Sequence, residues 1–207
     1  MIAGLWGKKV GMTQLFVEDS VVPVTVVDVG RWVITQIKTE KCDGYNAIQV
    51  GLIKKRYAQE SFVAGWLKKP KVYFAALREI RQKDAVSEET KVGQSVDCSS
   101  VVARGDKVDL FGVTIGRGFA GVVKRYNFGG PPGSHGSTMG KKPGSIGSFC
   151  SQGRVIKGKK MPGQMGNRNR VAKNLEVVRL EKESDVVLVK GSIPGKSGSL
   201  VFLRKEN

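Results

Sequence analysis

"VVPVTVVDVGRWVITQIK" occupies residues 21–38 and is the stretch that decides the fold class. It holds two runs rich in β-branched residues, 21–30 and 32–38, which the pair Gly30-Arg31 separates. β-branched residues favour strands, and a glycine between two such runs is typical of a turn. The stretch therefore predicts two β-strands joined by a turn.

Similar short runs continue along the chain, each bounded by turn residues. They lie at 45–53, 71–80, 107–115, 175–181, 185–191 and 199–205. Many short strands with turns between them are typical of an all-β barrel or sandwich. Helices are expected at only two places, 58–68, which Pro70 would stop, and 118–126. We expect a mainly β fold with one or two short helices and no internal repeat.

The charge of the chain is concentrated in one segment between these strands. The formal net charge is +17 over 207 residues, yet residues 110–175 contain no Asp or Glu. This acid-free segment holds 12 Lys or Arg, 15 of the 27 glycines and 4 of the 7 prolines. The flanking residues carry both signs of charge and the strand patterns. The sequence therefore predicts one β body interrupted by a long basic insertion.

The insertion is not expected to fold alone. Ordering 66 residues costs on the order of 70–130 kcal/mol of backbone entropy, and few large apolar groups are present to offset it. A polyanion would neutralise the cations, and glycine would let the backbone approach it closely. Side chains for stacking or hydrogen bonding to RNA are Tyr126, Phe128, Phe149, Asn127, Gln152, Gln164, Asn167 and Asn169. The alternative is a flexible, solvated linker.

So basic a protein usually meets nucleic acid, and the sequence offers no basic amphipathic helix or lipid anchor for a membrane surface. The N-terminal segment, 1–16, lacks the apolar core and cleavage site of a signal peptide. No run approaches the roughly 18 apolar residues that a membrane span needs. We therefore expect a cytoplasmic protein without a membrane partner.

The metal-binding and redox residues are few and scattered. Cys42, Cys98 and Cys150 are far apart in sequence and never form a C-x-x-C pair, and His135 is the sole histidine. This pattern favours neither a disulfide framework nor a zinc site. We expect no metal, no cofactor and three inert thiols.

Two glycine motifs resemble nucleotide-binding loops. "GRGFAG" (116–121) fits G-x-G-x-x-G, but no acid follows before Glu176, whereas a ribose-binding acid is expected about 20 residues on. "GRVIKGKK" (153–160) fits a P-loop until Lys160, which stands where Ser or Thr would bind Mg²⁺. Ser145, Ser148 and Cys150 have no general base in the acid-free segment. We expect no catalytic residue and no small-molecule substrate.

Several blocks of the sequence closely resemble the bacterial form of the ribosomal protein L3 family. The blocks are "GLWGKKVGMTQLF" (4–16), "DGYNAIQVG" (43–51), "VGQSV" (92–96), "GRGFAGVVKRYNF" (116–128), "HGS" (135–137), "PGSIGS" (143–148), "GKKMPGQMGNRNR" (158–170) and "VLVKGSIPG" (187–195). They follow the family's order along nearly the whole chain. Segment 54–90 matches poorly and is left unassigned.

The resemblance implies a β-barrel domain of the translation-protein type, 1–115 plus 174–207, and a basic extension, 116–173. It implies that this extension penetrates large-subunit ribosomal RNA toward the peptidyl-transferase centre. Family members bind that RNA near its 3′ end, help to nucleate subunit assembly and neighbour other large-subunit proteins. The resemblance therefore predicts a structural, non-enzymatic component of the large ribosomal subunit.

The predicted RNA-binding residues are basic side chains near the N-terminus and along the extension. They are Lys8, Lys9, Arg117, Lys124, Arg125, Lys141, Lys142, Arg154, Lys157, Lys159, Lys160, Arg168 and Arg170. The predicted extension tip comprises Gly144, Ser145, Ile146, Gly147 and Ser148.

The sequence departs from the family pattern at two places. Lys141-Lys142 replace the His-Arg pair that bacterial members often carry. Some members carry a methylated Gln just after the "GSIG" block, where this chain has Ser148-Phe149-Cys150, so that modification is not predicted. Two other functions remain open: an architectural DNA-binding protein, which shares the charge argument, and a nucleotide-using enzyme based on the two glycine motifs.

Overall fold

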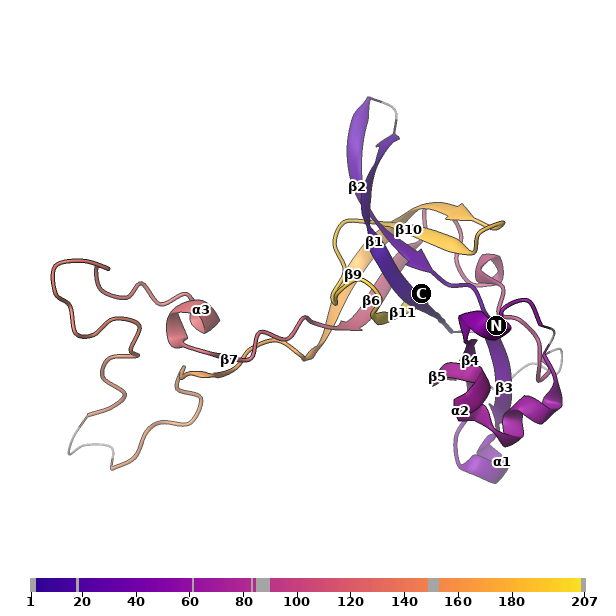
Figure 1. The fold of residues 1–207 in the computed structure, drawn as a ribbon, viewed down its shortest axis with the longest axis horizontal. Coiled ribbons are helices and arrows are strands. Elements are labelled where there is room, and N and C mark those ends of the chain that lie inside the picture. Colours follow the sequence, from indigo (N-terminus) through magenta and orange to yellow (C-terminus); the bar gives the residue numbers. More distant parts are fainter. Residues whose placement is uncertain are drawn as a thin grey trace. The chain divides into compact units, whose positions relative to one another are not determined.

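The computed structural model describes residues 3–17, 19–60, 62–82, 84, 90–148 and 153–205 (Figure 1). The chain divides into two compact units, which we call the body and the arm. The body comprises Met1–Val113 and Asn169–Asn207, and the arm is Thr114–Arg168. The predicted extension, 116–173, overlaps the arm, but its last five residues belong to a strand of the body.

Six antiparallel strands of the body pair into a closed ring, in the order β1-β11-β6-β9-β10-β2. They are β1 (Leu5–Val17), β2 (Ser20–Asp28), β6 (Lys107–Val113), β9 (Asn169–Glu181), β10 (Val186–Lys190) and β11 (Leu200–Lys205). β1 closes the ring because it pairs with β11 near Leu5 and with β2 from Lys8 onward. The expectation of a mainly β fold is confirmed.

The inside of the ring is the main hydrophobic core. Alternate residues of each strand point inward, as the period of two in a half-buried strand requires. The buried set is rich in valine and leucine and includes Val27, Val108, Leu110, Val177, Val187, Val189, Val201 and Leu203. The segment 98–102 adds Cys98 and Val102 to this core.

A second sheet, in the order β3-β4-β5, packs on the ring. Its strands are β3 (Trp32–Lys38), β4 (Ala47–Ile53) and β5 (Phe74–Arg81), and all pairings are antiparallel. Trp32, Ile34 and Ile48 form a buried cluster, against which Trp6 and Phe202 from the ring pack. This cluster thus joins the second sheet to the ring.

The helices of the body are short. They are α1 (Glu40–Asp43), η1 (Lys55–Tyr57), η2 (Ala64–Lys68), α2 (Pro70–Tyr73) and η3 (Cys98–Ser100), of which the η elements are 3₁₀ turns. The helix predicted at 58–68 is wrong, because Val63 has an extended backbone and interrupts it. The aromatic side chains around this break pack into a small core with Val33, Ile53 and Phe74.

Two other expectations also need correction. β1 was not predicted as a strand, although it is one of the two longest in the structure. The strand predicted at 71–80 begins only at Phe74, because Pro70–Tyr73 forms α2. The remaining predicted strands correspond to β2, β3, β4, β6, β9, β10 and β11.

The arm has little regular structure. It contains β7 (Phe119–Ala120), which pairs with β8 (Gly163–Gln164), and the helix α3 (Val122–Tyr126). The helix predicted at 118–126 therefore starts late, because residues 119–120 pair as a strand. Among the arm residues that the structure describes, only Ala120 and Val122 are buried hydrophobics. The described part of the arm therefore lacks an apolar core of its own, unlike the body.

Candidate nucleic-acid interface

Two antiparallel segments form the root of the arm. The amide of Arg117 donates to the carbonyl of Met165 at 2.8 Å, and the amide of Met165 donates to Gly118 at 2.9 Å. Thr114 and Arg168 pair in the same way, with the Thr114 amide 2.9 Å from the Arg168 carbonyl. Since these bonds use only backbone groups, the side chains of Arg117 and Arg168 remain exposed on the two segments.

Gly166 permits this close pairing. Its φ of +72° is a left-handed conformation, which glycine adopts without steric cost. A Cβ at this position would collide with the backbone carbonyl of Ile115. The glycine that follows Met165 is therefore required by the geometry of the root.

Arg125 joins α3 to the returning chain. Its Nη1 donates to the carbonyl of Met161 at 2.6 Å, and its guanidinium lies 5.0 Å from the centre of the Tyr126 ring. Lys160 Nζ lies 5.8 Å from the same ring. Cations near an aromatic ring are attracted to its face. Tyr126 thus gathers two of the predicted RNA-binding cations, one from each side of the arm.

The other arm cations face solvent. Exposed side chains are those of Arg117, Lys124, Lys141, Lys142, Arg154, Lys157, Lys159, Lys160 and Arg168, while Arg125 is half-buried. The arm contains no Asp or Glu, so none of these ten cations can form an ion pair within this unit. Like charges held close together without counter-charges repel one another unless an anion lies between them. A bound polyanion would relieve this repulsion.

The remaining predicted cations lie on the body, and one of them is buried. Arg170 is exposed on β9, and Lys8 is half-buried on β1. Lys9 is buried, and its Nζ donates to the carbonyls of Ile193 and Gly195, at 2.9 Å each. These carbonyls use two of the three N–H donors of the ammonium within the fold, and an RNA-binding role of Lys9 stays a prediction.

The predicted extension tip is an exposed turn. Gly144 to Ser148 are all solvent-exposed, and the hydroxyl of Ser145 donates to the carbonyl of Gly147 at 3.1 Å. Nothing within the described part of the tip provides a base that could activate a serine. Phe149, Cys150 and Gln152, which the sequence singled out beside the tip, lie outside the described residues.

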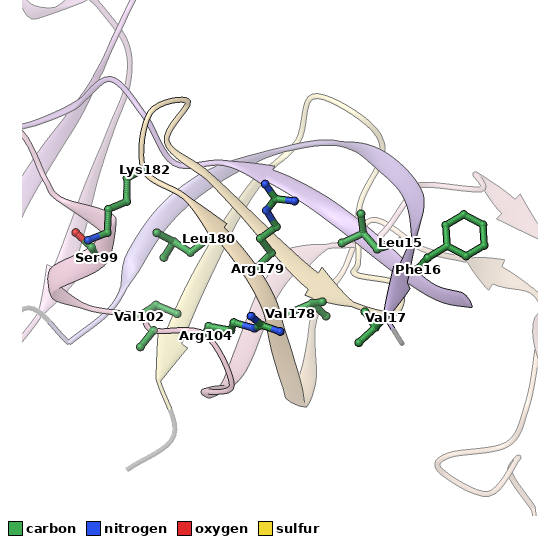
Figure 2. A pocket seen from close by; sticks show the side chains of 11 residues that line it. Leu15, Phe16, Val17, Ser99, Val102, Arg104, Val178, Arg179, Leu180 and Lys182 are labelled. Carbon is green, nitrogen blue, oxygen red and sulfur yellow. The ribbon is translucent and has the colours of Figure 1, made fainter. Parts of the chain in front are cut away.

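A pocket with a volume of about 740 Å³ lies on the body (Figure 2). Leu15 and Phe16 from β1 and Val178 and Leu180 from β9 provide apolar walls. The charged groups that line it are all cations, and they are Arg104, Arg179 and Lys182. Among the described residues, no carboxylate, histidine or thiol lines this pocket.

Shifted pKa values occur in the body, in ion pairs and in the core. Lys38 Nζ lies 2.7 Å from Glu79 Oε1, and hydrogen bonds from Lys38 and Tyr45 lower the pKa of Glu79. Burial raises the pKa of the Cys98 thiol, which keeps it protonated and unreactive.

Within the described residues, no three His, Cys, Asp or Glu side chains gather as metal ligands. No helix in that same part of the chain is long and apolar enough to cross a membrane.

Comparison with known proteins agrees with the resemblance seen in the sequence. A sequence model of the family "Ribosomal protein L3" matches residues 79–186. The chain is 44% identical to "Large ribosomal subunit protein uL3" of Syntrophotalea carbinolica, over 99% of this chain and 98% of the relative. The protein of the same name from Petrotoga mobilis is 41% identical, over 98% of this chain and 94% of the relative. The chain therefore belongs to the ribosomal protein L3 family.

Proposed function

We propose that this chain is a structural component of the large ribosomal subunit that binds ribosomal RNA through its arm. The observation that carries the proposal is the composition of the arm, which has ten cations and no acid and, among its described residues, almost no buried apolar group. Such a segment gains order from a polyanion rather than from its own packing. The names of the relatives place those proteins in the large subunit, which supports the same assignment here.

In this proposal the barrel domain, 1–115 plus 174–207, docks on the RNA surface, and the extension, 116–173, orders as RNA folds around it. The root cations Arg117, Lys124 and Arg125 hold the first half of the extension. Those from Arg154 to Arg170 hold the second half. The tip, Gly144 to Ser148, reaches toward the peptidyl-transferase centre, where RNA performs the chemistry and the protein adjusts its geometry.

Binding near the 3′ end of the large-subunit RNA, a role in nucleating assembly and contacts with neighbouring ribosomal proteins are further parts of the proposal. The chain works in the ribosome, in the cytoplasm, and needs no cofactor. Its relatives are ribosomal proteins rather than enzymes, which supports a non-catalytic role.

The test is the salt dependence of binding to a large-subunit ribosomal RNA transcript. If six to ten cations contact phosphate, log K falls with log salt at a slope of roughly −4 to −9. The variant Lys157→Gln/Lys159→Gln/Lys160→Gln should flatten this slope by about 2–3. A slope for the unchanged protein that is shallower than about −2 would mean that the charges stay solvated, and would overturn the proposal.

A competition experiment separates the two nucleic acids. Structured ribosomal RNA should displace the protein from duplex DNA at equal nucleotide concentration, because flexible segments recognise RNA by shape and 2′-hydroxyls. Equal affinity for both would favour an architectural DNA-binding protein. Micromolar binding of ATP or NAD in equilibrium dialysis would instead favour a nucleotide-using enzyme.

A further inference from the structure

A second segment of the chain carries most of the net charge that lies outside the arm. We call residues 54–73 the basic cap; it holds the six cations Lys54, Lys55, Arg56, Lys68, Lys69 and Lys71 and a single acid, Glu60. The rest of the body has 19 Lys or Arg against 17 Asp or Glu. Its charges therefore nearly cancel, whereas those of the basic cap do not. The basic cap lies within residues 54–90, the segment that resembles the family poorly.

An aromatic stack gives the basic cap a fixed shape. Trp66 and Tyr73 stack with their planes 2° apart and their ring centres separated by 5.0 Å, and Tyr57 lies 5.0 Å from Tyr73. Each ring comes from a different short helix, η2, α2 and η1 respectively. Trp66 is buried, and so is Phe74, whose ring packs against that of Trp66 in an edge-to-face arrangement. The three helices therefore meet at one point, and the side chains of Lys55 and Arg56 project from the helix that carries Tyr57.

The cations of the cap are exposed and concentrated. Lys54 Nζ donates to the carbonyl of Lys71 at 2.6 Å, which holds the first turn of the cap against α2. Lys55, Arg56, Lys68, Lys69 and Lys71 are solvent-exposed. Among the described residues, none of the cap cations takes part in an ion pair of the kind that neutralises Lys190 or Lys205. Rigid packing thus holds together like charges that repel one another.

We propose that the basic cap is a second phosphate-binding surface for ribosomal RNA, separate from the arm. This inference rests on the proposed function and adds a site to the body of the molecule. Lysines act as point charges on the RNA backbone, and Arg56 can hold a phosphate through two N–H groups. Because the aromatic stack orders the cap before binding, the cap loses less entropy on binding than the arm, which lacks a core. The contact reads backbone geometry rather than base sequence.

The experiment compares two double variants with the same change of charge. Lys68→Gln/Lys69→Gln removes two unpaired cap cations, and Lys190→Gln/Lys205→Gln removes two cations that are paired with Glu176 and Asp106. Both are measured as full chains with the large-subunit RNA transcript over a range of salt concentrations. The cap variant should flatten the log K against log salt slope by about 1.4–1.8, and the control should change it by less than about 0.5.

Two further measurements make the outcome specific. Lys68→Arg/Lys69→Arg should retain the slope of the unchanged protein, because the charges stay in place. In the complex of RNA with the unchanged protein, RNA should protect Lys68 and Lys69 from amine acetylation. This measurement uses no variant, so it does not depend on whether the variants fold. Acetylation of Lys68 and Lys69 at the rate of the free protein would overturn the proposal. So would a cap variant whose slope of log K against log salt equals that of the control variant.

The arm variant separates the two proposals. If Lys157→Gln/Lys159→Gln/Lys160→Gln flattens the slope while the cap variant does not, the cap inference fails and the proposed function stands. If the unchanged protein itself shows a slope shallower than about −2, both fail together.

Discussion

The Nζ of Lys9, on β1, lies 2.9 Å from the carbonyl oxygen of Ile193, on the loop that follows β10. A second bond to Gly195, also 2.9 Å long, makes this ammonium a clamp on the loop. The backbone of Lys9 strengthens the clamp, since its carbonyl accepts from the amide of Gly198 at 2.7 Å. A residue that the sequence presents as one of a pair of surface lysines is thus a central part of the body.

We predict that Lys9→Met destabilises the protein by about 2–4 kcal/mol, because two carbonyls lose a charged donor in a buried place. Urea unfolding followed by tryptophan fluorescence measures the loss. Lys8→Met is the matched control on the neighbouring residue and should change stability by less than about 0.5 kcal/mol. An equal loss of stability in the two variants would contradict a stabilising role for the hydrogen bonds of the Lys9 ammonium.

Gly166→Ala should open the root of the arm. The substitution places a Cβ against the Ile115 carbonyl at a positive φ, which costs about 1–2 kcal/mol in backbone conformation alone. Hydrogen exchange should speed up at the amides of Arg117 and Met165, while the amides of the body keep their protection. Gly116→Ala is the control, since its Cβ would meet only Asn167 Cβ at 3.5 Å.

The Lys38–Glu79 pair should make stability depend on acid pH. Hydrogen bonds from Lys38 and Tyr45 lower the pKa of Glu79 in the folded protein. A depressed folded-state pKa contributes stability above the unfolded value, near pH 4.3, and that contribution is lost as the pH falls through the folded value. Glu79→Gln should therefore lower Tm at neutral pH by a small amount.

The difference from the unchanged protein should shrink below about pH 4. Tyr45→Phe removes the 2.9 Å hydrogen bond from the Tyr45 hydroxyl to Glu79 and should give an intermediate effect. A difference in Tm that is constant from neutral to acid pH would show that Glu79 stabilises the body in some other way.

Trypsin should cut the free protein first between about residues 125 and 170, where the described Lys and Arg are mostly exposed and the described backbone makes few hydrogen bonds. Mass spectrometry of early fragments identifies the sites. Addition of ribosomal RNA should slow cleavage there and leave the slow cleavage of the body unchanged. Early cleavage within the body, with the segment 125–170 intact, would contradict the idea that the arm depends on RNA for its order.

The β-branched runs predicted most strands because burial on a pleated surface selects those residues locally. β1 was not predicted because glycines and the Lys8-Lys9 pair interrupt the alternation of apolar and polar residues that is typical of a strand. The structure explains two of these residues: a Cβ at Gly7 would lie 2.5 Å from Val27 Cγ1, and Lys9 has its buried partners some 185 residues further along the chain. These contacts form only when the ring closes and brings distant parts of the chain together, so a local sequence pattern does not predict them.

The candidate interface was predictable in part. The position of the arm was predictable, because its lack of acidic residues can be read directly from the sequence. The surroundings of individual cations were not, because only the packing of the folded chain distinguishes the buried Lys9 from Lys8. The basic cap was missed for a related reason: "KKR" at 54–56 and "KKPK" at 68–71 look like two ordinary surface runs. Only the stack of Tyr57, Trp66 and Tyr73 shows that they belong to one surface.

Val113 and Asn169 stand opposite each other in β6 and β9, so the 55 intervening residues leave and re-enter the ring at one rung of its hydrogen-bond ladder. A tight hairpin could replace the whole insertion without altering the register of any strand. Evolution could therefore have lengthened, shortened or rewritten the arm while the scaffold that carries it stayed as it was.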